Sequence, residues 1–264
     1  MQDMLFGRYI PGDSWIHKLD PRAKLMGTMI FVVIIFFANS WLTYGLMFLF
    51  VMVALFLSDL SLMFFLKGIR PMILLISITV LLQMLFTAGE TVYFSWGIFA
   101  LTKEGIINGV FIFLRFLLII FMSTLMTLTT MPLSLTDALE SLLNPLKKIK
   151  VPVHEIALML SIALRFVPTL MDETEKIMNA QRARGIEFGE GSLMNQMKSI
   201  IPLLVPLFIS SFNRAEELAT AMEARGYKGG EGSTKYRELI WKTQDTIAML
   251  ALLALTVASV VLRS

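Results

Sequence analysis

The sequence predicts an all-α integral membrane protein with five transmembrane helices and about three long amphipathic helices in the cytoplasm. Hydrophobic residues make up 56% of the chain, and the mean hydropathy is +0.72. Only 16% of the residues are charged, whereas soluble domains carry about a quarter. The charges are concentrated, because 14 of the 23 Lys and Arg and 13 of the 20 Asp and Glu lie between Asp137 and Lys242. Membrane-embedded segments are therefore expected on both sides of one charged block.

Two spans account for the first apolar run. Residues 25–58 form a stretch of 34 residues without a charge. One helix of that length would measure roughly 50 Å, whereas the hydrocarbon core of a bilayer is about 30 Å thick. A turn at 39–40 divides the run into two short spans, over 22–38 and 41–57.

The remaining predicted spans cover 71–88, 105–130 and 246–262. The span over 105–130 contains a single charge, Arg115. The segment 91–102 is too short to cross a bilayer and is rich in aromatic residues, which favour the membrane interface. This segment is expected on the outer surface.

Three amphipathic helices are expected between the fourth and the last span, near 134–147, 153–184 and 192–225. The uncharged runs in this region, 156–164 and 199–212, are too short to cross a bilayer on their own. Such runs, interrupted by charges, are typical of helices that lie at the interface or extend from it. Their apolar stripes would face lipid or protein.

The distribution of Lys and Arg predicts the orientation, because basic residues favour the cytoplasmic ends of spans. The basic residues beside the first three spans are Lys18, Arg22, Lys24, Lys67 and Arg70, and the basic block follows the fourth. The N-terminus is therefore expected in the cytoplasm, and the C-terminal tail with Arg263 outside. Three domains follow: 1–130 with the first four spans, a cytoplasmic helical domain over 131–242, and the last span within 243–264.

A nine-residue pattern occurs twice, 41 residues apart. Ala183-Arg184-Gly185 is followed after three residues by Gly189-Glu190-Gly191, and Ala224-Arg225-Gly226 is followed in the same way by Gly230-Glu231-Gly232. The match extends upstream, where Glu175 corresponds to Glu216 and Ala180 to Ala221. Each copy therefore has the pattern of a helix end.

The glycines of this repeat, Gly185 and Gly226, are well placed to end their helices in a left-handed cap. Arg184 and Arg225 would then lie in the last turn, near the negative end of the helix dipole. The residue four positions before each arginine is alanine, so neither arginine has the usual intrahelical carboxylate partner. The duplication favours a docking role. The alternative is that each arginine only bonds the carbonyls of its own helix.

These features resemble the transmembrane T component of energy-coupling factor (ECF) transporters over essentially the whole chain. The further matching motifs are Gly7-Arg8-Tyr9-Ile10-Pro11-Gly12-Asp13-Ser14, His17-Lys18-Leu19-Asp20-Pro21-Arg22, Thr129-Thr130-Met131-Pro132, Asn144-Pro145-Leu146 and Leu164-Arg165-Phe166-Val167-Pro168. One Ala-Arg-Gly alone has no specificity. Two at this spacing, together with the N-terminal motifs, are specific.

The resemblance implies a non-catalytic subunit of an ABC-type importer in a bacterial plasma membrane. Two cytoplasmic ATPase subunits, expected to be non-identical, would bind ATP and Mg, and this chain would bind no cofactor. Ala183, Arg184 and Gly185 would dock into one ATPase, and Ala224, Arg225 and Gly226 into the other. The apolar faces of the long helices would hold an interchangeable membrane protein, the S component, which binds a vitamin or another micronutrient.

Further residues are candidates for structural or coupling roles. Arg182 and Glu223 occupy equivalent positions with opposite charge, which could distinguish two ATPases. Arg115 is costly in a span unless it reaches the outer interface or binds a neighbouring helix, and a functional role has equal weight. Arg165 is expected to fix a bend before Pro168 or a contact between helices. Pro145, in the Asn-Pro-Leu motif, belongs to the same group.

Other chemistry is poorly supported by the sequence. With no cysteine and two distant histidines, His17 and His154, a metal site is not expected. The glycine-rich repeats lack the lysine and hydroxyl of a nucleotide-binding loop, and the net charge of +3 reflects membrane orientation rather than a nucleic-acid surface. An integral-membrane enzyme would need a clustered catalytic set. The main alternative is an autonomous permease, which should carry polar residues at mid-depth in several spans, whereas only Arg115 is present.

Overall fold

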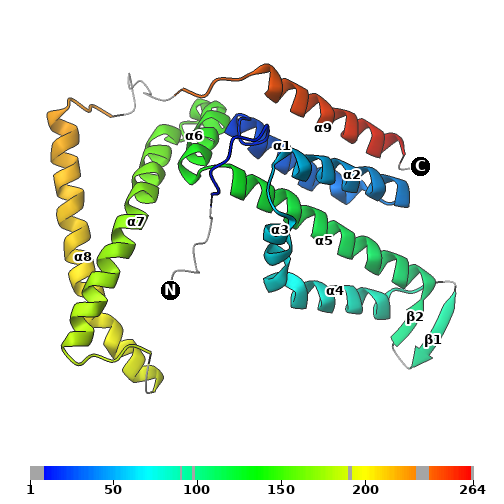
Figure 1. Ribbon diagram of the computed structural model, residues 1–264, viewed down its shortest axis with the longest axis horizontal. Helices are drawn as coiled ribbons and strands as arrows, with labels where there is room; N and C mark the ends of the chain where they lie inside the picture. Colours follow the sequence, from blue (N-terminus) through cyan, green and yellow to red (C-terminus); the bar gives the residue numbers. More distant parts are fainter. Residues whose placement is uncertain (1–8, 90, 97–98, 190–191, 230–237, 263–264) are drawn as a thin grey trace. The chain divides into compact units, whose positions relative to one another are not determined.

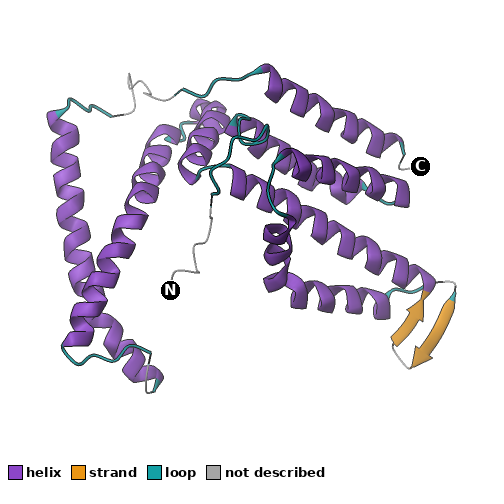
Figure 2. Cartoon of the chain, in the orientation of Figure 1, coloured by secondary structure: helices purple, strands orange, loops and turns teal. Residues whose placement is uncertain are grey.

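The computed structural model of the chain describes residues 9–89, 91–96, 99–189, 192–229 and 238–262. Helices dominate this part of the chain, as predicted, and one short hairpin is the exception (Figures 1 and 2). The helices are α1 (Pro21–Ile34), α2 (Trp41–Leu57), α3 (Leu62–Ile69), α4 (Ile73–Phe86), α5 (Lys103–Thr129), α6 (Pro132–Leu143), α7 (Val153–Ala183), α8 (Leu193–Ala224) and α9 (Thr243–Val261).

The chain divides into two compact units. The first contains residues 1–138 and 239–264, and the second contains 139–238. The chain leaves the first unit within α6 and returns to it four residues before α9 begins. Each unit is described separately below.

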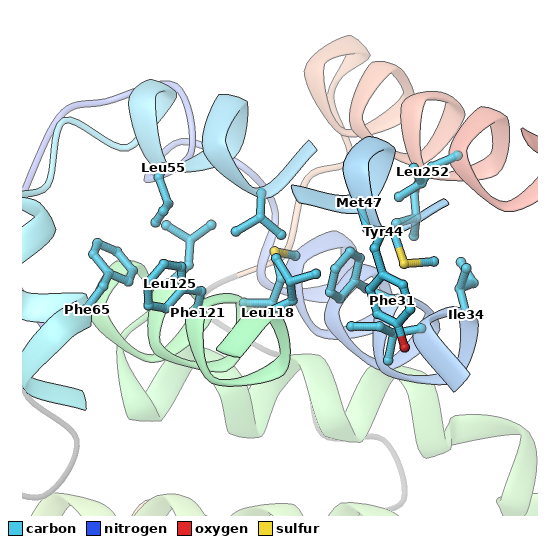
Figure 3. Packing of buried hydrophobic residues seen from close by; sticks show 14 of the residues in the cluster. Phe31, Ile34, Tyr44, Met47, Leu55, Phe65, Leu118, Phe121, Leu125 and Leu252 are labelled. Carbon is cyan, nitrogen blue, oxygen red and sulfur yellow. The ribbon is translucent and has the colours of Figure 1, made fainter. Parts of the chain in front are cut away.

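The first unit is built around a hydrophobic cluster between α1, α2, α3, α5 and α9. Figure 3 shows aromatic and aliphatic side chains from these helices packed together. Phe31, Met47, Phe65 and Leu118 have no exposed surface. Outward-facing side chains on the same helices are apolar and exposed, among them Phe56 and Leu74. A helix bundle with an apolar interior and an apolar exterior is suited to a bilayer rather than to water.

Local signals explain where the first two helices begin and end. Pro21 occupies the first turn of α1 with Asp20 as its N-cap, and a 3-10 turn over Ile35–Phe37 ends the helix. Ser40 then caps α2, because its hydroxyl accepts a hydrogen bond from the Thr43 amide at 3.3 Å. The predicted turn at 39–40 is confirmed.

The region after α2 differs from the prediction. A further helix, α3, occupies 62–69, which the sequence analysis left outside the third span. A 3-10 turn over Arg70–Met72 separates α3 from α4, because Pro71 has no amide hydrogen to continue an α-helical ladder. The segment 91–102, predicted only as an outer surface loop, forms the antiparallel hairpin of β1 (Val92–Trp96) and β2 (Phe99–Thr102).

Among the described residues, four helical stretches are long and apolar enough to cross a membrane: Leu62–Phe86, Lys103–Thr129, Val153–Ala183 and Thr243–Val261. The helix Trp41–Leu57 is apolar but one residue short of that length criterion. The prediction placed Val153–Ala183 at the interface because Arg165 interrupts its apolar run. The helix continues past Arg165, and its apolar surface extends to Met171 before the charges of Asp172 and Glu173.

Candidate functional site

The C-terminus of α7 ends in a backbone cap centred on Gly185. Gly185 has a φ of +86°, in the left-handed region that favours glycine. Its amide donates to the Arg182 carbonyl at 2.9 Å, and the Ile186 amide donates to the Gln181 carbonyl at 3.1 Å. This pair of bonds defines a Schellman motif.

The C-terminus of α8 repeats this geometry at Gly226. The glycine has a φ of +78°, its amide donates to the Glu223 carbonyl at 2.9 Å, and the Tyr227 amide donates to the Met222 carbonyl at 3.0 Å. Both left-handed caps predicted from the sequence are therefore confirmed. Because backbone amides satisfy the last carbonyls, neither helix needs an arginine side chain to cap it.

The two arginines at these caps, Arg184 and Arg225, are exposed. Within the described part of the chain, neither guanidinium has a hydrogen bond or an ion pair. No atom lies within 4 Å of the position that a Cβ would take on Gly185 or Gly226. Each helix end thus presents a cation beside open backbone, where a second protein could approach closely.

Helices α7 and α8 pack against each other in antiparallel fashion. Glu173 of α7 accepts a hydrogen bond from the Ser210 hydroxyl and forms an ion pair with Arg214 at 3.3 Å. The Arg214 guanidinium also lies over the Phe166 ring, 5.7 Å from its centroid. In Figure 1 the two helices approach each other in this region and diverge toward the C-terminal end of α8.

The ion pair joins equivalent positions of the sequence repeat, because Glu173 and Arg214 are also 41 residues apart. Each lies 11 residues before the arginine of its own helix end, which is about 16 Å along a helix. Since the helices are antiparallel, Arg184 and Arg225 lie on opposite sides of this contact. The repeat thus places two similar docking points at two separate locations.

A second contact between α7 and α8 depends on the prolines of α8. Pro206 has no amide hydrogen, so the Pro202 carbonyl lacks its helical donor four residues later. The side chain of Gln181, buried at 8% exposure, donates to that carbonyl from α7 at 3.2 Å. The sequence analysis treated Gln181 only as part of the variable flank of the repeat.

The other predicted residues have varied surroundings. Arg165 is exposed, and α7 continues through Pro168 without ending. Arg182 donates to Asn179 at 3.4 Å and stacks over Phe188, whereas Glu223 is exposed. Pro145 lies in the first turn of a 3-10 helix, Asn144–Ile149. The contact between helices that Arg165 was expected to make is formed by Arg214 instead.

Arg115 is half-buried near the middle of α5. Its guanidinium lies over the Phe36 ring, 5.1 Å from the centroid, and its Nε is buried without a hydrogen-bond partner. Phe36 belongs to the turn after α1, close to the predicted outer surface. This position favours the structural interpretation, in which the side chain extends toward the outer interface.

Metal-binding and acid-base chemistry find little support in the described ranges. They contain no group of three or more His, Cys, Asp and Glu that could hold a metal ion. His17 bonds Ser14 and Ile10, and His154 bonds Glu140 at 3.0 Å. The repeat residues Glu190, Gly191 and 230–232, and the tail residue Arg263, lie outside the described residues.

The fold and these helix ends define a class: a helical, multi-pass membrane protein with a charged helical unit that presents two matching arginines. Comparison with known proteins identifies it further. Residues 12–236 match the family model CbiQ, described as cobalt transport protein. The chain belongs to this family, and within it to the EcfT group of transmembrane components of ECF transporters.

Similar proteins span the whole chain. The energy-coupling factor transporter transmembrane protein EcfT of Lacticaseibacillus paracasei is 59% identical over 264 residues, which is 100% of both chains. The protein of that name from Lactococcus lactis subsp. cremoris is 58% identical over 257 residues, 97% of each chain. The one from Bacillus subtilis is 50% identical over 264 residues, again 100% of both chains.

Proposed function

We propose that this chain is the coupling subunit of an ECF importer and transmits movement from two ATPase subunits to a substrate-binding membrane protein. The observation that carries the proposal is the pair of exposed guanidiniums at Arg184 and Arg225, on helix ends that are already capped by backbone amides. The names of the relatives, transmembrane proteins of energy-coupling factor transporters, support it.

The two helix ends bind two ATPases, one at each Ala-Arg-Gly. A guanidinium makes bidentate, directional hydrogen bonds to carboxylates and carbonyls, and the open glycine beside it allows close backbone approach. The ATPases bind ATP and Mg and carry out hydrolysis. This chain is not an enzyme and holds no cofactor. The proposal is supported by the absence of a metal cluster in the described residues.

The ATPases are non-identical, and the flanks of the two arginines contribute to the choice between them. Arg182 and Glu223 place opposite charges two residues before Arg184 and Arg225. Gln181, by contrast, is engaged with Pro202 and has an internal role. Arg182→Glu should therefore weaken one ATPase contact, and the normal pairing of both ATPases in that variant would contradict charge selection.

The S component lies against the apolar faces of α7 and α8. These faces expose methionines and aromatic rings whose flexible or flat surfaces can pack against different partners. They include Met159, Met171, Met194, Met197, Phe208 and Phe212. A surface of this kind suits an interchangeable partner that carries a vitamin or another micronutrient.

The membrane orientation places the charged unit in the bacterial cytoplasm, with the N-terminus inside and the C-terminus outside. The position of basic residues supports this orientation. It also brings both arginines to the side of the membrane where ATP is available.

Affinity purification of the full chain from its native membrane in detergent tests the proposal. Wild type is compared with Arg184→Ala, Arg225→Ala and the double variant, and ATP hydrolysis is measured for each. Lys198→Ala is the matched control, because it removes one exposed cation from α8 away from both helix ends. We expect wild type and the control to bring two ATPases and a small membrane protein, and the double variant to lose the ATPases.

An autonomous permease would give a different result. It would purify without ATPases, and its affinity for a solute would be the same in all variants. That outcome would contradict the coupling function.

A further inference from the structure

The N-terminal motifs have no part in the docking of ATPases, yet they form a dense set of contacts inside the first unit. Residues 9–24, which we call the N-terminal clasp, bind the end of α5 and the start of α9. These are the segments next to the places where the chain leaves the first unit for α7 and α8 and returns from them.

On the exit side, the clasp caps α5. The last carbonyls of a helix have no donor within the helix. The Ile10 amide donates to the Leu128 carbonyl at 2.9 Å, and the Lys24 ammonium donates to the Thr129 carbonyl at 2.8 Å. Lys24 is 8% exposed and also donates to the His17 carbonyl at 3.2 Å. The end of α5 is thus held by a segment more than 100 residues earlier in the chain.

His17 holds Ile10 in place for this contact. Its Nε2 lies 3.0 Å from the Ile10 carbonyl, and a carbonyl can only accept, so Nε2 carries the hydrogen. Its Nδ1 lies 2.7 Å from the Ser14 hydroxyl. A Cβ on Gly12 would stand 2.8 Å from the His17 ring, so the ring fits only beside a glycine. The motif residues Ile10, Gly12, Ser14 and His17 therefore act as one folded turn.

On the return side, the clasp binds α9 through Asp245, which has no exposed surface. One carboxylate oxygen of Asp245 accepts from the Asp20 amide at 2.7 Å, and the other accepts from the Lys242 amide at 2.7 Å. Arg22 donates to the Asp20 carboxylate and, at 3.0 Å, to the Leu239 carbonyl. Leu239 is the first residue of the returning chain in the first unit.

We propose that the N-terminal clasp transmits movement of the coupling helices into the membrane, because it fixes the exit and return segments to each other. Without the clasp, displacement of α7 and α8 would move the end of α5 and the start of α9 independently. With it, both segments and the start of α1 move together. Lys24 and Asp245 are positioning residues in this role, which rests on the coupling function proposed above.

The test uses the full complex in liposomes: this chain, the two ATPases and a riboflavin-binding S component, with tritiated riboflavin as the probe. The measured quantity is riboflavin accumulated per ATP hydrolysed. Lys24→Met keeps the apolar stem and removes the donors, and Asp245→Asn keeps one acceptor of two. Ser259→Ala is the matched control, because it removes a buried hydrogen bond from α9 away from the clasp.

We expect both clasp variants to assemble and hydrolyse ATP, with riboflavin per ATP lowered about fivefold or more, the usual effect of losing a hydrogen bond to a charged group. Lys24→Arg restores a cationic donor and should recover part of the ratio, whereas Ser259→Ala should match wild type. An unchanged ratio, a proportional loss of uptake and hydrolysis, or failure of both variants to assemble would each overturn the clasp. If the wild-type complex assembles no ATPases or takes up no riboflavin, the coupling function fails, and the clasp with it.

Discussion

At the scale of single residues, the division of labour at the two helix ends is informative. Glycine in the left-handed conformation lets backbone amides satisfy the last carbonyls, so the adjacent arginine is not needed for that task. The guanidinium can then bind another molecule without destabilising its own helix. The same geometry at residues 184–185 and 225–226 indicates that this arrangement was duplicated as a unit.

The glycine caps can be tested by adding a methyl group. Alanine at position 185 must adopt a positive φ, which costs about 1 kcal/mol for an L-residue. Since open space surrounds the position, the cost is in the backbone alone. We expect Gly185→Ala to speed hydrogen exchange of the cap amides about fivefold, measured by mass spectrometry in detergent.

Gly45→Ala provides the matched control for this experiment. Gly45 also has open space around its Cβ position, but it lies within α2, where alanine is preferred over glycine. Exchange in α2 should stay the same or become slower. Equal exchange of the α7 cap in wild type and Gly185→Ala would show that the left-handed glycine does not stabilise this helix end.

The residues that the sequence predicted correctly are those whose signal is local. Gly185 and Gly226 could be assigned because a glycine at the end of a periodic run favours a left-handed cap. Gln181 and Asp245 could not, because their partners, Pro202 and Asp20, are set by tertiary packing. For Glu173 and Arg214 a signal was present, since their spacing of 41 equals that of the repeat, but only the antiparallel packing gives that spacing a meaning.

At the scale of the helices, α8 shows how a local defect becomes a contact. Pro202 and Pro206 lie inside a helix of 32 residues and each removes one backbone donor. The carbonyl freed by Pro206 is used by Gln181 of α7, so the irregularity fixes the register of two long helices. A helix with a complete ladder would offer α7 no such acceptor.

A double-mutant cycle tests this contact. Gln181→Leu leaves the Pro202 carbonyl without a donor and should lower the free energy of unfolding by about 1 kcal/mol, measured by denaturation with SDS. Pro206→Ala supplies a helical donor to the same carbonyl. In that background the cost of Gln181→Leu should therefore be smaller.

Pro202→Ala is the control for the cycle. It adds a donor for the Lys198 carbonyl and leaves the Pro202 position without a new partner, so Gln181→Leu should cost as much in that background as in wild type. Additive effects for Gln181→Leu and Pro206→Ala would show that the freed carbonyl does not couple the two helices.

Helix positions were predictable to within a few residues, and the exceptions have physical causes. The bounds of α2, α7 and α8 follow the predicted 41–57, 153–184 and 192–225, because capping residues and hydrophobic periodicity agree there. The hairpin after α4 was missed because aromatic, β-branched residues suit an interface loop and a strand equally well. The apolar extent of α7 was underestimated because Arg165 interrupts the run without ending the helix.

At the scale of the whole molecule, the charge distribution determines which side of the membrane each segment occupies. Basic residues lie before α1, between α2 and α4, and in the second unit. Helix α7 meets the length and composition criteria for a span, although its C-terminal part carries Asp172, Glu173, Glu175 and Lys176. If α7 crossed the membrane, Arg184 would lie outside, where no ATPase could bind it.

Single-cysteine labelling separates these topologies, since the native chain contains no cysteine to interfere. Asn39→Cys and Thr91→Cys place a thiol at exposed positions predicted outside, and Glu187→Cys places one just after α7. The first two should react with a membrane-impermeant maleimide in intact cells, and Glu187→Cys only after permeabilisation, because positively charged segments are retained inside. The cysteine-free chain should remain unlabelled throughout. Labelling of Glu187→Cys in intact cells would make α7 a transmembrane helix and exclude Arg184 as an ATPase contact.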